Sequence, residues 1–484
     1  MTAYLCGTAT GDPSPLIEIL PDEILLEIFD CRRLATLDDS SDPWKWHRLV
    51  HVCRRWRTLI FESPRRLDLR LLYTYKNPPR KSLELWPDFP ISVWYPKSPR
   101  RRLTTDDEEN VLAVLKHTDR ICDINLSMTR QLASKSTTLL KESFPILQRL
   151  VLRSQEPLRP LPVPDGFLGE STPLLREVHL IRTVFPTLPV LLSSAQALVT
   201  LQLDDIPNSG YFSPEALANG LSGMAHLNTL KIRFIPPNAH ERSLDASLIN
   251  RAILPTLTEF EFKGNCEYVE DLVSRIDAPA LGKISITFIE QPTFGIPRLA
   301  RFIARTKEAK LPHHASVRFS DEITITQHFR RPSCADSSNG TFQLQIPCDE
   351  LDRQISLLIH LCQYISEPLS GVERLDIEAF PRSIWMDGEE MDTSVWLELF
   401  RSFRGAKSLE VSGGLVTSVA SALERASGEM ARIVLPALRD LHMLDSPAST
   451  CIEPFIAARQ LCNRPVTVHY EKEGSLDDKK SEDA

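Results

Sequence analysis

The feature that most constrains the fold of this 484-residue chain is a repeated pattern of apolar residues. The pattern has the form L-x-x-L-x-L, with any apolar residue in the L positions, and its copies start 23 to 34 residues apart over most of the chain beyond residue 105. Copies start at Ile121, Leu147, Leu175, Leu198, Leu227, Leu257, Leu281, Val372, Ala406 and Leu438. Two weaker copies, at His314 and Thr341, lie inside a single longer interval of 91 residues. Alternating apolar positions are typical of strands that bury one side, so the period predicts one strand per unit.

Signals for helices fall between these predicted strands. Ser213 followed by Pro214 fits a helix start, and apolar residues recur at helical spacing between Leu351 and Cys362. This organisation resembles the leucine-rich repeat, in which each unit is one strand with one helix or loop. The resemblance implies an α/β fold over residues 106–465, a curved solenoid with parallel strands on the concave face and helices and loops on the convex face. The asparagine position of the motif is clearly filled only at Asn265, so the repeats are degenerate. The alternative is an ordinary α/β domain with leucine-rich strands.

In such a solenoid the residues between the apolar positions point outward from the concave face. Basic residues in these positions gather around residues 231–283, and acidic residues gather around residues 376–410. A mixed polar surface of this kind suits protein recognition, with an unselected solvated surface as the alternative. The predicted target-binding residues are Lys231, Arg233, Glu261 and Lys263.

Two apolar helical patterns lie near the amino terminus. The first follows Leu20-Pro21, where proline fits the first turn of a helix, and the acidic residues Asp22 and Glu23 complement the positive helix terminus. The second begins at Trp46 and repeats apolar residues at three- and four-residue steps as far as Ile60. Two helices with this much apolar surface cannot hide it within about fifty residues, so they indicate a partner surface.

These two patterns resemble the two halves of an F-box of the fungal type, in an N-terminal three-helix domain over residues 15–70. The resemblance implies that the chain docks a Skp-type adaptor, and through it a cullin, as the substrate-recognition subunit of a ubiquitin ligase. It assigns adaptor binding to Leu20, Pro21, Ile24, Leu25, Ile28, Phe29, Val52, Cys53, Trp56 and Leu59. The link from Arg33 to Arg48 is longer than in a compact F-box. The alternative is a helical cap on a larger domain.

Charge is unevenly distributed along the chain, whose net charge is −8. Residues 44–105 hold 15 basic and 4 acidic side chains. We expect residues 71–105 to be a solvated basic linker. The run Arg100 to Arg102 has a nuclear localisation patch and a nucleic-acid contact as its alternatives. We expect residues 1–14 to be disordered and residues 466–484 to form a charged tail.

Signals for catalysis or cofactor binding are thin. No phosphate-binding loop, nucleophile elbow or zinc-protease motif occurs, and we expect neither a metal nor another cofactor. The ten cysteines form no C-x-x-C pair, which indicates reduced thiols and a location in the cytoplasm, the nucleus or both. No apolar run approaches the roughly 18 residues of a membrane span, and the start of the chain lacks secretory-signal features. The sequence therefore favours a non-catalytic adaptor, with a binding scaffold outside any ligase as the main alternative.

Overall fold

The computed structural model describes most of the chain, and its residues divide into two compact units, 1–126 and 127–484. The described residues are 20–34, 45–63, 67, 69–79, 83, 88–96, 103–156, 159–185, 187–236, 251–290, 295–306, 312–329, 340–365, 369, 371–379, 393–426, 428–444 and 452–471. The predicted disordered start, the run Arg100 to Arg102 and the tail beyond residue 471 lie outside this set.

The first unit begins with helices. These are α1 (Asp22–Leu34), the 3-10 helix η2 (Lys45–His51) and α2 (Arg54–Glu62). Helix α1 begins immediately after Pro21, with Asp22 and Glu23 in its first turn, as the helix dipole favours. Helix α2 is capped by Cys53, whose Sγ accepts a hydrogen bond from the Trp56 amide at 3.5 Å. The two predicted helical patterns are therefore helical in the structure.

The rest of the first unit corrects the prediction of a basic linker. Residues 71–105 contain two parallel strands, β1 (Leu71–Thr74) and β2 (Ile91–Tyr95), and β2 pairs in parallel with β3 (Ile121–Met128). Ile91, Val93 and Tyr95 are fully buried because the strand alternates apolar residues, a signal that the basic composition around it obscured. Helix α3 (Thr105–Leu115) lies between β2 and β3 and begins with a capping box between Thr104 and Asp107.

The second unit is built on a large sheet, whose strand order is β4-β6-β8-β9-β11-β13-β16-β15-β14-β17-β18-β19-β20. The bounds are β4 Arg149–Ser154, β6 Glu177–Ile181, β8 Thr200–Ile206, β9 Thr229–Phe234, β11 Glu259–Gly264, β13 Lys283–Phe288, β14 Pro312–Phe319, β15 Glu322–Phe329, β16 Gly340–Pro347, β17 Arg374–Ala379, β18 Ser408–Ser412, β19 Asp440–Leu444 and β20 Thr467–Glu471. Each main copy of the apolar pattern from Leu147 onward is followed, two residues later, by the start of a strand. Two short parallel pairs stand apart from this sheet, β5 (Leu161–Pro162) with β7 (Thr183–Val184) and β10 (Ala252–Ile253) with β12 (Ile276–Asp277).

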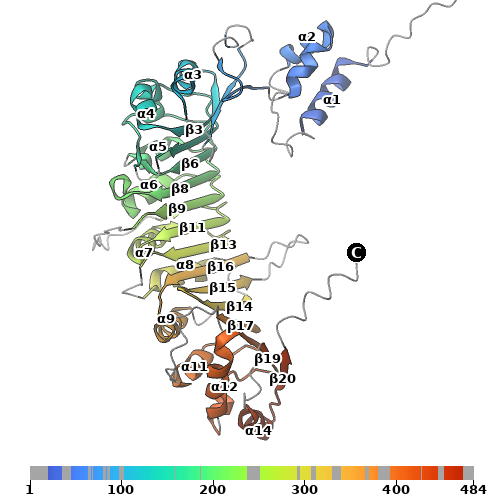
Figure 1. The fold of residues 1–484 in the computed structure, drawn as a ribbon, viewed down its shortest axis with the longest axis vertical. Helices are drawn as coiled ribbons and strands as arrows, with labels where there is room; N and C mark the ends of the chain where they lie inside the picture. The colour runs from blue at the N-terminus through green and yellow to red at the C-terminus, as the bar shows by residue number, and fades with distance from the viewer. Residues whose placement is uncertain are drawn as a thin grey trace, which may run out of the picture. The chain divides into compact units, whose positions relative to one another are not determined.

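Helices of the second unit alternate with its strands. The α-helices are α4 Arg130–Ser136, α5 Leu188–Ser194, α6 Pro214–Leu221, α7 Cys266–Arg275, α8 Pro297–Arg305, α9 Leu351–Tyr364, α11 Thr393–Phe400, α12 Val416–Arg425, α13 Met430–Ile433 and α14 Glu453–Leu461. Short 3-10 helices are η4 Leu139–Lys141, η5 Phe167–Glu170, η6 Asn208–Gly210 and η8 Gly413–Leu415. Helices α5 to α8 lie along one face of strands β6 to β13, each beside the next (Figure 1). Helix α7 caps the start of α8, because the Glu270 carboxylate accepts hydrogen bonds from the backbone amides of Arg298 and Leu299 at 2.9 and 2.7 Å.

The predicted all-parallel arrangement is wrong at one place. Strand β15 pairs antiparallel with both β14 and β16, while β14 is parallel to β17 and β16 is parallel to β13. The two weak copies of the pattern are β14 and β16, which enter the sheet in reversed order with β15 between them. Strand β20 is a further correction, because it lies inside the predicted charged tail and pairs in parallel with β19.

Candidate functional site

One face of the sheet in the second unit carries polar side chains at alternate strand positions. We call these partly exposed alternate residues of β4 to β20 the polar face. The intervening alternates, such as Leu230, Ile232, Phe260 and Phe262, are fully buried. The residues that the sequence placed outward stand in register on successive strands: Val151, His179, Gln202, Lys231, Glu261 and Ser285. Among them Val151 is buried, so the polar part of the row starts at His179.

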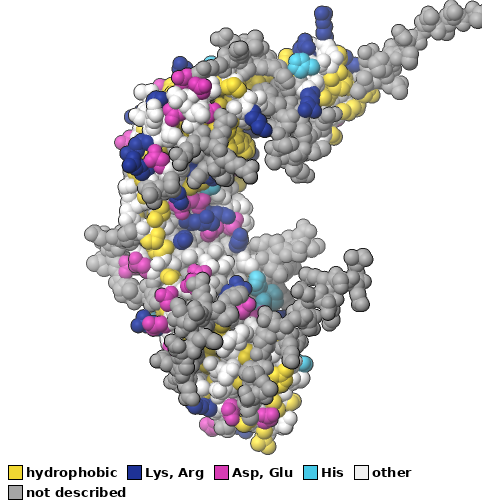
Figure 2. Space-filling view, viewed as in Figure 1, with side chains coloured by type: hydrophobic (Ala, Val, Ile, Leu, Met, Phe, Trp, Pro, Cys, Tyr) yellow, Lys and Arg dark blue, Asp and Glu magenta, His cyan; other side chains and the backbone are white. Residues whose placement is uncertain are grey.

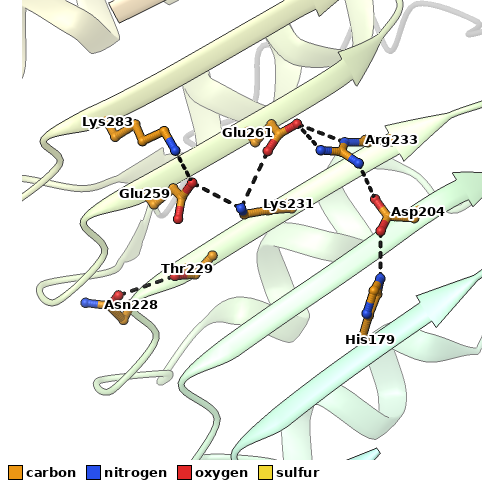
Figure 3. A network of polar contacts seen from close by, with 9 residues as sticks. All are labelled: His179, Asp204, Asn228, Thr229, Lys231, Arg233, Glu259, Glu261 and Lys283. Carbon is orange, nitrogen blue, oxygen red and sulfur yellow. Dashed lines mark hydrogen bonds and ion pairs between the residues drawn. The ribbon is translucent and has the colours of Figure 1, made fainter. Parts of the chain in front are cut away.

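A chain of charged contacts runs along this face across five strands (Figure 3). His179 Nε2 lies 2.6 Å from Asp204 Oδ2, and Arg233 Nη1 lies 3.2 Å from the other oxygen of that carboxylate. Arg233 also donates through Nε to Glu261 at 2.8 Å. Lys231 Nζ lies 3.7 Å from Glu261.

The chain of contacts continues to the next strand through Glu259. Its carboxylate lies 3.1 Å from Lys231 Nζ and accepts from Lys283 Nζ at 2.8 Å. Three basic and three acidic side chains thus neutralise one another, and His179 adds a contact to Asp204 at one end. We call these seven residues the charge network: His179, Asp204, Lys231, Arg233, Glu259, Glu261 and Lys283. Figure 2 shows Lys and Arg side chains next to Asp and Glu side chains over this part of the sheet.

The charge network perturbs the pKa of its own carboxylates. Burial alone would raise the pKa of Asp204, but the hydrogen bond to His179 and the charges of Arg233 and Lys231 outweigh it and lower that pKa below 3.8. For Glu259 burial likewise opposes the hydrogen bonds from Lys283 and Lys231, and the net effect is a pKa below 4.5. Both carboxylates are therefore held in the charged form.

The four predicted target-binding residues do not behave alike. Lys231, Arg233 and Glu261 belong to the charge network, whereas Lys263 is exposed and has no ion-pair partner among the residues that the structure describes. The predicted target-binding set leaves out Glu259 and Lys283, which lie at the next alternate position of β11 and β13. The same period-2 signal marks them.

A second polar group lies on this face around Asp376 and Glu410, in the acidic region that the sequence indicated. His314 Nε2 lies 2.6 Å from Asp376 Oδ2, and the rings of His314 and His328 stack with centroids 5.1 Å apart. Arg374 forms ion pairs with two carboxylates, through Nε with Asp376 Oδ1 at 2.9 Å and through Nη2 with Glu410 Oε2 at 2.8 Å. His442 and His469 stack further along, with centroids 4.6 Å apart. The reversed order of β14 to β16 brings His328 beside His314, so only the topology shows this pairing.

The helical part of the first unit forms a separate candidate site. Helix α1 packs on α2 through Phe29 and Trp56, whose rings meet edge to face with centroids 4.8 Å apart. Arg55 joins the starts of both helices, donating to Asp22 Oδ1 through Nη2 at 2.6 Å and to the Leu20 carbonyl at 2.6 Å. The side chain of Arg57 also donates to the Val50 carbonyl, at 2.9 Å.

This helical region is also where a comparison with known families succeeds. Residues 17–70 match the F-box-like family. An F-box-like domain indicates a subunit that is typically a non-catalytic adaptor, in general of the Skp–cullin–F-box type. A search of curated proteins finds no match.

Burial divides the predicted docking residues of the F-box-like domain into two groups. Leu25 and Phe29 are buried between the helices, so in this structure they serve packing. Ile24, Ile28 and Val52 are large apolar side chains that are 46%, 42% and 58% exposed. The remaining predicted docking residues are Pro21 and the helix cap Cys53, both exposed, and Leu20, Trp56 and Leu59, all half-buried.

No group of three or more metal-ligating side chains occurs among the residues that the structure describes. Within that same part of the chain, no helix combines the length and the apolar character needed to cross a bilayer.

Proposed function

We propose that this chain is the substrate-recognition adaptor of a Skp–cullin–F-box ubiquitin ligase. Its F-box-like domain, matched over residues 17–70, docks a Skp-type adaptor. The sheet of the second unit binds the target protein. The chain itself performs no chemistry and raises the rate by holding the target near the charged ubiquitin carrier.

The observation that carries this proposal is the exposed apolar surface of the F-box-like helices. Ile24 and Ile28 lie one turn apart on α1, so they share a face, while Leu25 and Phe29 face α2. Exposed large apolar side chains beside a well-packed helix pair are typical of a protein-binding surface. This arrangement supports docking through Ile24, Ile28 and Val52, with Leu20 and Pro21 at the start of the same helix.

We further propose that the second unit is a degenerate leucine-rich-repeat-like solenoid whose polar face meets the target. The regular offset between pattern and strand supports the repeat assignment. The parallel, in-register stacking of polar side chains supports recognition, because strands fix the backbone of each contact residue before binding. Such an adaptor acts in the cytoplasm, the nucleus or both.

The test is purification of the tagged full-length chain from its own cells, followed by detection of a Skp-type adaptor and a cullin. We expect both to be recovered. Recovery of neither would overturn the proposal and favour the scaffold outside any ligase. Turnover of a small substrate by the isolated chain would show that it is an enzyme instead.

A further inference from the structure

The polar face changes its charge from one end of the sheet to the other. We call strands β4, β6, β8, β9, β11 and β13 the basic section, because its polar face holds six basic side chains against four acidic ones. The basic ones are Arg149, Arg153, Lys231, Arg233, Lys263 and Lys283. The acidic ones are Glu177, Asp204, Glu259 and Glu261.

Strands β14, β15, β17, β18 and β19 carry the opposite balance, and we call them the acidic section. Their polar face holds two basic side chains, Arg318 and Arg374, against five acidic ones. The acidic ones are Glu322, Asp376, Glu378, Glu410 and Asp440. A group of His side chains lies on this section, as Figure 2 also shows.

Strand β16 separates the two sections and contributes no charge to the polar face. Its alternate residues are Thr341, Gln343 and Gln345. Gln345 accepts a hydrogen bond from Thr287 Oγ1 of β13 at 2.7 Å and donates to Glu322 of β15 at 3.1 Å. A neutral amide thus bridges the basic section to the acidic section.

The surplus charge of each section sits on particular residues. Most charges pair within their own section, as in the charge network, Arg149 with Glu177 at 3.0 Å and Arg318 with Glu378 at 3.1 Å. Arg153 and Lys263 in the basic section have no ion-pair partner within the described part of the chain. In the acidic section, Glu322 has no ion-pair partner within the described residues either, but it accepts a hydrogen bond from Gln345, whereas Asp440 has neither an ion pair nor a side-chain hydrogen bond there. Arg153, Lys263 and Asp440 are therefore placed to pair with charges from outside.

We propose that the target binds the polar face through one segment whose charge changes sign, acidic where it crosses the basic section and basic where it crosses the acidic section. This inference rests on the proposed function, since it names the kind of target that the same sheet accepts. A segment of a single sign would meet repulsion over one of the two sections. Strands lie about 4.8 Å apart, so the face from β4 to β19 spans about 50 Å. An extended segment of about 15 residues has that length.

Three synthetic peptides test this inference. Each has about 15 residues, because at a rise of ~3.3 Å per residue an extended chain of that length spans the polar face. One carries an acidic half and a basic half, one is acidic throughout and one is basic throughout. Binding of each labelled peptide to the full-length protein is followed by fluorescence anisotropy at low and at high salt. We expect the peptide of two signs to bind about tenfold more tightly than either other peptide, and to weaken in high salt. Equal or tighter binding of a single-sign peptide, or no binding of the two-sign peptide, would overturn the inference.

Paired variants locate the contact. Arg153→Glu with Lys263→Glu should weaken the two-sign peptide by about tenfold and favour the all-basic one. Because neither residue has an ion-pair partner in the described structure, the reversal leaves no native pair broken. Lys141→Glu on η4 is the matched control for the basic section. Asp440→Lys tests the acidic section, with Glu424→Lys on α12 as its control.

The same variants keep this inference separate from the proposed function. Adaptor capture is measured on each of them, because the F-box-like domain belongs to the other unit. Unchanged peptide binding by both surplus-charge variants, with adaptor capture intact, overturns the two-sign target alone. Failure of the unaltered chain to capture a Skp-type adaptor overturns the proposed function, whatever the peptides do.

Discussion

At the scale of single residues, Lys231, Arg233 and Glu261 share one face of the sheet and their charges neutralise one another. Their spacing predicts a common face because strand residues alternate. Which charged side chains form ion pairs across neighbouring strands depends on the register between those strands, and register is set by tertiary packing. Lys263 follows the same spacing, yet it remains exposed and has no ion-pair partner in the described structure.

The charge network predicts that removing two basic residues from adjacent strands lowers the free energy of unfolding by unequal amounts. Arg233→Ala should lower the free energy of unfolding by about 1 kcal/mol, because Asp204 and Glu261 both lose a partner in a half-buried setting. Lys263→Ala should change it by less than about 0.5 kcal/mol. Urea unfolding of the two variants measures the difference, and equal effects would contradict the network.

His328 predicts a pH dependence of stability. Burial, with the neighbouring His314 and His313, lowers the pKa of His328 below 6.5, although Asp376 opposes this. The unfolded chain then binds a proton at this site more readily than the folded one. The contribution of His328 to the free energy of unfolding is therefore complete above pH 6.5 and is lost as the pH falls towards the folded-state pKa. His328→Asn should flatten the change in urea midpoint between pH 7.5 and 5.5, whereas the exposed-histidine control His226→Asn should not. An unaltered slope in His328→Asn would argue against this placement.

At the scale of elements, the existence of α1 and α2 could be predicted, but the role of each apolar residue could not. Ile24 and Leu25 are adjacent in one apolar stripe, and only the packing of α1 on α2 decides that Leu25 is buried and Ile24 exposed. Strands β1 and β2 were missed because they are short and do not carry the L-x-x-L-x-L pattern. Local basic composition then dominated the interpretation, although Ile91, Val93 and Tyr95 alternate as strand residues do.

The division within α1 predicts different outcomes for neighbouring substitutions. Ile24→Asp with Ile28→Asp should reduce adaptor binding by about 30-fold or more, a loss of about 2 kcal/mol, while the helices stay folded. Leu25→Ala should instead lower stability by about 2 kcal/mol or more, because it leaves a cavity between the helices. Circular dichroism separates the two effects. Full adaptor binding by the double aspartate variant would refute docking through this face.

The start of α1 gives a further test. Leu20→Ala with Pro21→Ala should abolish detectable adaptor capture while the second unit stays folded, because the half-buried Leu20 and the exposed Pro21 both lie at the start of the docking helix. Capture in a pull-down, alongside the unfolding midpoint of the second unit, provides the measurement. Unchanged capture would remove these two residues from the docking surface.

At the scale of the whole molecule, the repeat period predicted where most strands of the second unit begin, because each sequence repeat contributes one strand to the same sheet. It failed at β15, whose apolar residues alternate as in any strand but whose direction depends on its two neighbours. The copies at His314 and Thr341 were placed in the sequence but not in the sheet, where their order is reversed. Period and spacing identify strands, while hairpins inside a repeat array need the three-dimensional pairing.

The central claim is that the F-box-like domain makes this chain a ligase adaptor. The most direct measurement is calorimetric titration of the purified full-length protein with a purified Skp-type adaptor from the same cells. We predict a one-to-one complex with a Kd of about 1 μM or tighter, equivalent to about 8 kcal/mol, which the Ile24→Asp, Ile28→Asp variant loses. Absence of binding by a folded, unaltered chain would contradict the account.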